Sequence, residues 1–143
     1  MTMTMTNRGL YHLLNTAISG STDLRAAVFT GSVPSVASIR DMNFLSDLTA
    51  VSTEAAASGY SRADLASVTL SENDAADKVT LVATAPEWAN VAVGETWTHV
   101  AYYIEGASDA ARVLVAVDDP ASDQVTNGGN ITGPTPAWDV TGS

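Results

Sequence analysis

The sequence predicts a mainly β fold: an antiparallel β-sandwich or barrel-like domain with one N-terminal amphipathic helix and extended termini. Two observations support this prediction. Several short runs rich in β-branched and aromatic residues follow one another at close spacing, with turn residues between them. Only one convincing helical pattern precedes them, and no alternation of strands and helices joins them. With 143 residues, the chain fits one domain.

The predicted helix covers residues 7–20. Thr6 or Asn7 is suited to cap its start, and Gly20 is suited to close its end. Its apolar side chains recur at the spacing of one helical face: Leu10, Leu13, Leu14, Ala17 and Ile18. Such a stripe must be buried, most simply against the sheet that follows.

The next segments have a different period. Residues 24–30 (LRAAVFT) predict a strand that ends at the turn residues Gly31 and Pro34. Residues 39–48 carry apolar side chains three residues apart, which predicts one or two irregular helical turns. Residues 50–57 predict a further strand, although three consecutive alanines weaken the pattern.

Two strand pairs are predicted in the second half of the chain. Residues 66–70 and 78–82 both alternate and are expected to form a hairpin. Residues 96–105 and 112–117 are aromatic and β-branched, which favours core strands. A last short strand is expected near residues 137–141, at an edge, because Gly and Pro precede it.

These elements give three parts. Residues 1–6 are predicted to be an extended N-terminal arm, and residues 7–119 to be the helix plus antiparallel β domain. Residues 120–143 form a Gly- and Pro-rich C-terminal segment, expected as an edge strand or a second arm.

Composition and charge exclude several classes of function. The net charge is −10, and the six basic residues form no patch, so a broad electrostatic grip on nucleic acid is not expected. Without cysteine there are no disulfides, thiolate nucleophiles, zinc ribbons or iron–sulfur sites. No long apolar run or signal-peptide pattern is present, so we expect a soluble protein without a membrane partner.

The two histidines are His12 and His99, and their sequence context favours structural roles. His12 lies beside the leucine stripe of the predicted helix and is expected to be solvated or to cap. His99 is expected to be a hydrogen-bonded strand residue on the same face as Trp97 and Ala101. Neither HxH nor HExxH spacing occurs, so a histidine metal site is not expected.

The acidic runs and possible nucleophile motifs are the other candidate sites for metal binding or catalysis. Residues 71–77 resemble a calcium loop superficially but lack its glycine and its twelfth-position Glu, so a hairpin turn is expected. Asp118 and Asp119 before Pro120 are expected in a solvated loop. No GxSxG, GK[ST] or GxGxxG motif occurs. The sequence therefore predicts a protein that is not an enzyme and has no cofactor or metal.

The three tryptophans leave two alternatives open. Trp88 and Trp97 are expected to fill the core, and the alternative is a stacking platform for sugars. Trp138 lies in the Gly- and Pro-rich segment and would be exposed unless it docks, which makes it a predicted partner contact.

The first six residues alternate Met and Thr. In an extended form Met1, Met3 and Met5 would share one face, so they are predicted partner contacts that add to the sheet edge of a neighbouring molecule. The alternative is a frayed terminus.

The order of sequence pieces over about residues 7–119 resembles a group of small virion proteins of tailed bacteriophages. In that group, pieces similar to FLSDV, GYTR, a central Trp and A-Y-Y/I-Y before a charged turn recur in the same order. The matching pieces here are NRGLYHLLNTAISG, LRAAVFTG, FLSDLTAVSTE, SGYSRADL, VTLSENDAADKVTLVA, a Trp, WTHVAYYIEG and RVLVAVDD. The Met-Thr prefix and the segment after Asp119 depart from the group's pattern.

The resemblance implies a non-enzymatic part of the virion. The first expectation is a head decoration or minor capsid protein that binds the major capsid protein and copies of itself. It would be a symmetric homo-oligomer on the capsid surface, made in the cytoplasm of the bacterial host. The alternative is a tail- or neck-associated adaptor or fibre-base module, and a carbohydrate-binding module is the third hypothesis.

Overall fold

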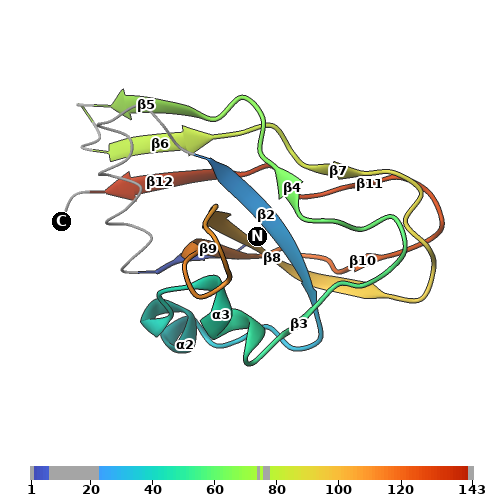
Figure 1. Ribbon diagram of the computed structural model, residues 1–143. Coiled ribbons are helices and arrows are strands. Elements are labelled where there is room, and N and C mark those ends of the chain that lie inside the picture. Colours follow the sequence, from blue (N-terminus) through green and yellow to red (C-terminus); the bar gives the residue numbers. More distant parts are fainter. Residues whose placement is uncertain (1, 7–22, 74, 76–77, 142–143) are drawn as a thin grey trace.

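The computed structural model describes residues 2–6, 23–73, 75 and 78–141. They form a mainly β arrangement in which all paired strands are antiparallel, so the prediction of a mainly β antiparallel fold is confirmed (Figure 1). The barrel-like alternative is wrong, because no sheet in the described ranges closes on itself. The predicted helix over residues 7–20 and His12 lie outside the described residues.

In the described residues, the fold consists of three sheets and two short helices. The large sheet has the order β1-β9-β8-β2-β3, with β10 added to β8 and β4 added to β2, and the small sheets are β11-β7 and β12-β6-β5. The bounds are β1 Thr2–Met5, β2 Leu24–Thr30, α2 Val36–Asp41, α3 Leu45–Thr49, β3 Thr53–Glu54, β4 Ala63–Asp64, β5 Thr69–Asn73, β6 Lys78–Val82, β7 Glu87–Trp88, β8 Thr96–Ile104, β9 Val113–Asp119, β10 Gln124–Val125, β11 Ile131–Thr132 and β12 Ala137–Thr141.

The longer strands lie close to where the sequence predicts them. β2, β6 and β8 match their predicted ranges almost to the residue, and β12 lies at the edge of its sheet. β5 begins later than the predicted 66–70, and the strand expected over residues 50–57 is reduced to two residues, β3. Pro120 follows the end of β9 and has no N–H to continue the ladder.

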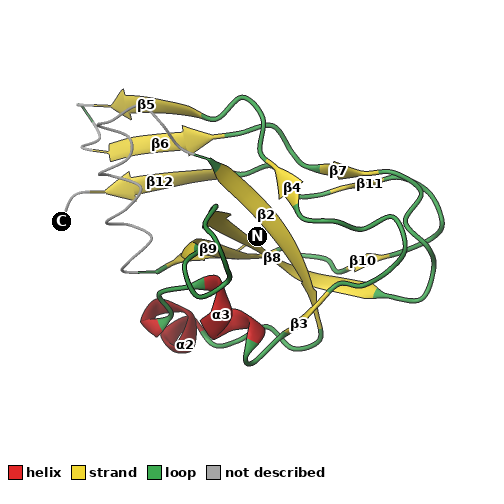
Figure 2. Cartoon of the chain, viewed as in Figure 1, coloured by secondary structure: helices red, strands yellow, loops and turns green. Residues whose placement is uncertain are grey.

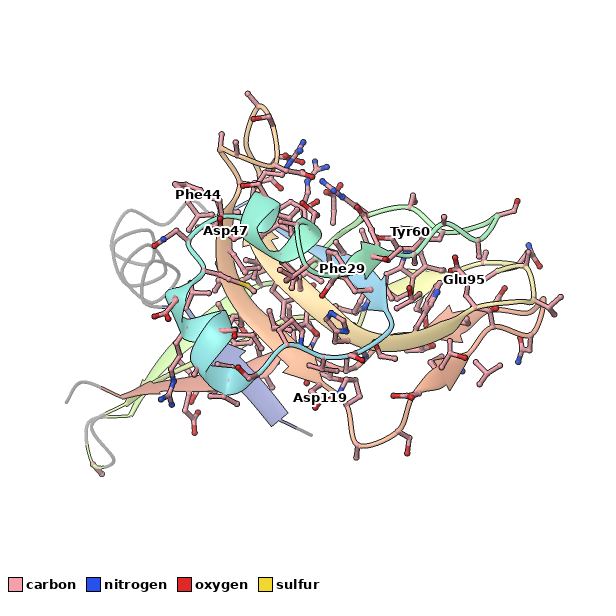
Figure 3. The ribbon with its side chains drawn as sticks, turned by 90° about the horizontal axis from the view of Figure 1, so that it is seen from below. Phe29, Phe44, Asp47, Tyr60, Glu95 and Asp119 are labelled. Atoms are coloured by element: carbon pink, nitrogen blue, oxygen red, sulfur yellow. The ribbon has the colours of Figure 1, made fainter. Side chains whose placement is uncertain are left out.

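The two helices form where irregular helical turns were predicted, and side chains cap their starts. The Ser35 hydroxyl accepts from the Ser38 N–H at 3.2 Å to start α2. The Asp47 carboxylate accepts from the backbone N–H groups of Asn43 and Phe44 at 2.8 and 2.9 Å to start α3 (Figure 3). No helix of the described ranges is long and apolar enough to cross a membrane.

One face of the large sheet shares a core with the two small sheets. Leu24, Val28 and Tyr102 point to this side from β2 and β8. The small sheets contribute Leu81, Trp88, Ile131 and Trp138 to the same cluster. This core therefore includes Ile131 and Trp138 of the C-terminal segment together with the strands of the predicted central domain.

The opposite face of the large sheet is covered by α2 and α3 (Figure 2). Phe29, Tyr103 and Leu114 of the sheet pack there against Leu45 and Leu48, which have no exposed surface. Because successive side chains of a strand point to opposite faces, the near-continuous apolar runs of β2 and β8 serve both cores.

The strand β1 belongs to the large sheet of its own chain. Thr2 to Met5 pair with Asp119 to Ala116 of β9. Beyond the strand, the Thr6 N–H donates to the Val115 carbonyl at 3.1 Å, and the Thr6 hydroxyl donates to the Leu114 carbonyl. The segment predicted to be an extended N-terminal arm thus pairs with β9 of its own chain.

Candidate functional site

Three aromatic rings meet beside the large sheet, at the end of the molecule where β7 and β8 lie together. The centroids of Trp88 and Trp97 are 5.2 Å apart at 80°, and Tyr60 packs edge-on against Trp97 at 5.6 Å. Such edge-to-face pairs add stability beyond the area that they bury. The cluster is therefore a rigid part of the core.

The two tryptophans offer no open stacking platform. Trp88 and Trp97 are only 4% and 5% exposed. Their indole N–H groups are also engaged, Trp88 with the Ser61 carbonyl at 2.6 Å and Trp97 with the Glu95 carboxylate at 2.9 Å. The rings agree with the expected core role, and they form no open platform at the surface on which a sugar could stack.

Tyr60 fills a gap between the two short strands that line the outer edge of β2. β3 pairs with the Phe29 end of β2 and β4 with the Arg25 end, and between them the Val28 N–H donates to the Tyr60 hydroxyl at 3.0 Å. That hydroxyl donates in turn to Glu54 at 2.9 Å. Burial raises the pKa of Tyr60, so it acts as a neutral hydrogen-bonding group.

Arg62 is the centre of a network of ion pairs. Its guanidinium contacts both carboxylate oxygens of Glu54 at 2.7 to 2.8 Å and Asp109 at 2.7 Å, and it lies 5.7 Å from the ring centroid of Tyr103. The hydrogen bonds to Glu54 and Asp109 raise the pKa of Arg62, and the pKa of Asp109 is lowered by its bond to Arg62. The network ties the loop around Asp109 to β3.

Two further arginines extend the network. Arg112 binds Glu105 and Asp109, and Arg25 binds Asp64 at 2.7 Å and Glu105 at 2.9 Å. The pKa of Glu105 is lowered by the Gly106 N–H first and by Arg112 next. Because each of these arginines is paired with carboxylates, we assign the network to holding loops together rather than to catalysis.

His99 is neutral and structural. It is 1% exposed, stacks on Phe29 with centroids 5.4 Å apart, and shares a hydrogen bond of 2.8 Å between Nδ1 and the Thr98 hydroxyl. Burial lowers its pKa to about 4. The expectation that it shares a face with Trp97 is wrong, because the pairing register with β2 shifts between these two positions.

Asp118 is the most unusual titratable group of the described residues. The sequence placed it in a solvated loop, but it lies within β9 and has no exposed surface. Within the described part of the chain, neither carboxylate oxygen has a hydrogen-bond partner, and burial raises the pKa to about 6. The prediction of a solvated loop is wrong here because the ladder continues to Asp119.

Metal ligands do not gather in the described ranges, where no group of three or more His, Cys, Asp or Glu side chains is placed to hold a metal ion. Residues 74, 76 and 77 of the acidic run lie outside those ranges, so the calcium-loop comparison is tested only in part.

The structure removes the reason for expecting Trp138 to dock on a partner. Its side chain is 7% exposed and packs on Tyr102 with ring centroids 5.4 Å apart. β12 pairs with β6, which brings Trp138 opposite Leu81 and into the shared core. The Pro- and Gly-rich sequence before Trp138 gives no local indication of this long-range pairing.

The predicted methionine contacts are placed only in part. Met3 and Met5 lie in β1, opposite Asp118 and Ala116 of β9, whereas Met1 and the methionine side chains lie outside the described residues. The backbone of this segment pairs with its own chain rather than with a neighbour's edge. The methionine contacts therefore stay a prediction.

We name the surface formed by residues 57–59, 89–94 and 124–130 the uncharged tip. The sequence patterns did not identify this surface. None of these residues is ionisable. The three loops meet at the end of the molecule where β7, β10 and β11 lie (Figure 1). No local signal distinguishes the tip in the sequence, because uncharged runs are common in a chain of which only 15% is charged.

Backbone hydrogen bonds hold the uncharged tip in shape. Ala92 N–H donates to the Ser58 carbonyl at 2.8 Å, and Gly128 N–H donates to the Val91 carbonyl at 2.8 Å. Val93 and Val125 are 70% and 60% exposed, which makes them two of the most exposed large apolar side chains described. Glu95 lies just behind the tip, near Tyr60 (Figure 3), and binds the Ala56 N–H at 2.8 Å.

Taken together, the described residues offer an aromatic core, a paired arginine network and an uncharged tip with exposed valines. Among these features, the uncharged tip with its exposed valines has the character of a contact surface. Comparison with protein-family models, curated proteins and solved structures finds no match to this chain.

Proposed function

We propose that the chain is a structural protein of a tailed-bacteriophage virion, specifically a capsid decoration or minor capsid protein. It binds the outer shell, stabilises contacts between major capsid subunits and acts as a symmetric oligomer without catalysis, cofactor or nucleic acid. The resemblance of its sequence pieces to that group of virion proteins motivates the proposal. The uncharged tip is the structural observation that supports it.

The tip suits repeated contacts between acidic proteins. With a net charge of −10, copies of this chain repel one another and other acidic surfaces. An uncharged, hydrogen-bonded end with Val93 and Val125 exposed is the place where a neighbour can approach at the lowest electrostatic cost. Many identical weak contacts of this kind become strong through repetition on a shell.

The finer fold expectation also stays a proposal. We regard the large sheet and the two small sheets as the two layers of a β-sandwich. The core shared by Tyr102, Leu81 and Trp138 supports this view.

The test uses purified particles. We expect hundreds of copies per particle by quantitative mass spectrometry, and density for the chain on the outer shell by electron cryomicroscopy. About a dozen copies at the tail or neck would favour the second candidate, an adaptor or fibre-base module. Absence from virions would refute both candidates.

Charge placed on the tip tests the contact itself. V93D and V125D should reduce binding to particles stripped of the protein by at least tenfold, because an ionised carboxylate resists burial. V51D is the matched control, since Val51 is 65% exposed and follows α3, outside the tip. Equal loss of binding in all three variants would contradict the assignment of the tip.

A further inference from the structure

A small cavity lies between β8 and the strand pair β7–β11, and its volume is about 180 Å³. Its buried floor consists of apolar and aromatic side chains: Val28, Trp88, Trp97, Val100 and Ile131. Its lining also includes the exposed residues Ser122, Gln124 and Thr132, and the half-buried Pro120 and Pro134. The cavity is thus apolar at its floor and polar at its rim.

The floor presents carbon atoms rather than hydrogen-bonding groups. Both indole N–H groups are already bound within the protein, Trp88 to Ser61 and Trp97 to Glu95. A ligand group on the floor therefore gains contact with ring and branched aliphatic surface only.

The walls are fixed in place before any ligand arrives. A Cβ on Gly133 would lie 3.0 Å from the ring of Trp88 and 3.0 Å from Pro86, so glycine allows a closer approach here than other residues do without a shift of these neighbours. The Gly133 N–H also donates to the Pro86 carbonyl at 2.8 Å. A preformed site loses less conformational entropy on binding.

The cavity favours neutral ligands. His99 is the only titratable residue that lines it among the described residues, and its ring turns to the opposite face of the sheet, where it stacks on Phe29. No carboxylate of the described part of the chain lines the cavity to pair with a cation, and the net charge of −10 disfavours anions.

The volume matches a single ring. An engineered apolar cavity of about 150 Å³ in another protein binds benzene. We propose that this cavity binds one neutral aromatic ring with a single polar substituent. The ring lies on the tryptophan floor, and the substituent meets the Ser122, Gln124 and Thr132 rim. This site is independent of the virion role.

Phenol is the simplest probe of this chemistry, and the test uses the full chain. We expect saturable binding with a Kd on the order of 1 mM. In NMR spectra the indole N–H signals of Trp88 and Trp97 should move, and that of Trp138 should stay. N-acetyl-tyrosinamide distinguishes the source, because its binding indicates a tyrosine side chain of a partner protein. Binding of phenol alone indicates a free small molecule.

Substitutions at the rim test the location. S122F and T132F should each weaken phenol binding at least tenfold, because the added ring competes for the floor. Two separate rim positions guard against a single variant that fails to fold. V93F is the matched control, since it adds the same ring to an exposed valine that does not line the cavity. Undiminished binding in both rim variants would overturn the proposal, as would glucose binding in place of phenol or no saturation by 10 mM phenol.

Discussion

Replacing Asp118 with Asn should stabilise the protein at neutral pH. The Asp118 side chain has no exposed surface, and its carboxylate oxygens lack hydrogen-bond partners within the described residues. An ionised carboxylate in that position loses its hydration and gains no hydrogen bond from the described residues. Asn keeps the shape of the side chain and removes the charge.

The magnitude follows from the shifted pKa. Burial raises the pKa of Asp118 from 3.8 to about 6. At 1.36 kcal/mol per pKa unit, ionisation in the folded state costs about 3 kcal/mol. The folded state binds this proton more tightly than the unfolded state does. The contribution of the bound proton to the free energy of unfolding is therefore complete below pH 3.8 and is lost as the pH rises through 6.

Urea unfolding of both proteins between pH 4 and pH 8 provides the measurement. The free energy of unfolding of D118N should exceed that of the wild type by about 2.5 kcal/mol more at pH 8 than at pH 4. D123N is the control, since it removes the same charge from an exposed site. A difference between D118N and wild type that does not vary with pH would refute the reasoning.

Three further predictions concern the network, the tip and the buried histidine. R62M should lower the free energy of unfolding by about 1–3 kcal/mol in urea titrations, because two partly buried carboxylates lose their partner. G59A should lower Tm more than G94A does. Both glycines have positive φ, but only a Cβ at Gly59 lies 2.6 Å from the Asn90 carbonyl oxygen. The free energy of unfolding of the wild type should fall by about 3 kcal/mol between pH 7 and pH 4 through His99, because folding lowers the pKa of His99 from 6.5 to about 4. In urea titrations over this range, H99F should lack that component of the pH dependence.

The longer strands could be predicted from sequence because their signals are local. β2, β8 and β9 are long apolar runs with turn residues at their ends, and few secondary structures other than a strand fit such runs. The two-residue strands β7, β10 and β11 carry no local signal. β10 exists only because Gln124 and Val125 meet Trp97 and Thr96 across the fold.

The errors at individual residues have the same origin. The alternation rule assumes a regular pleat, and the register shift between Trp97 and His99 breaks it, which sends the two rings to opposite cores. Trp138 and Asp118 were expected at the surface because their neighbours in sequence are polar or turn-forming. Pairing of β12 with β6, and of β1 with β9, buries them. The structural roles of Tyr60 and Arg62 could not be predicted from the sequence, where both residues belong only to a piece that carries the family resemblance. Their hydrogen-bond partners, such as Val28 and Asp109, lie far away along the chain.

The distribution of charge connects the fold with the proposed role. Arg25, Arg62 and Arg112 are all used within the molecule, where they join loops of one region through paired carboxylates. These arginines are therefore unavailable to attract acidic partners, and the excess of acidic residues keeps the rest of the surface repulsive toward copies of itself. Contacts that need no charge can supply attraction instead, and the uncharged tip is one place where the described structure provides them. If most of the surface repels other copies and one end attracts them, the chain can pack in a defined orientation without aggregating. The proposed role as a repeated part of a shell requires such packing.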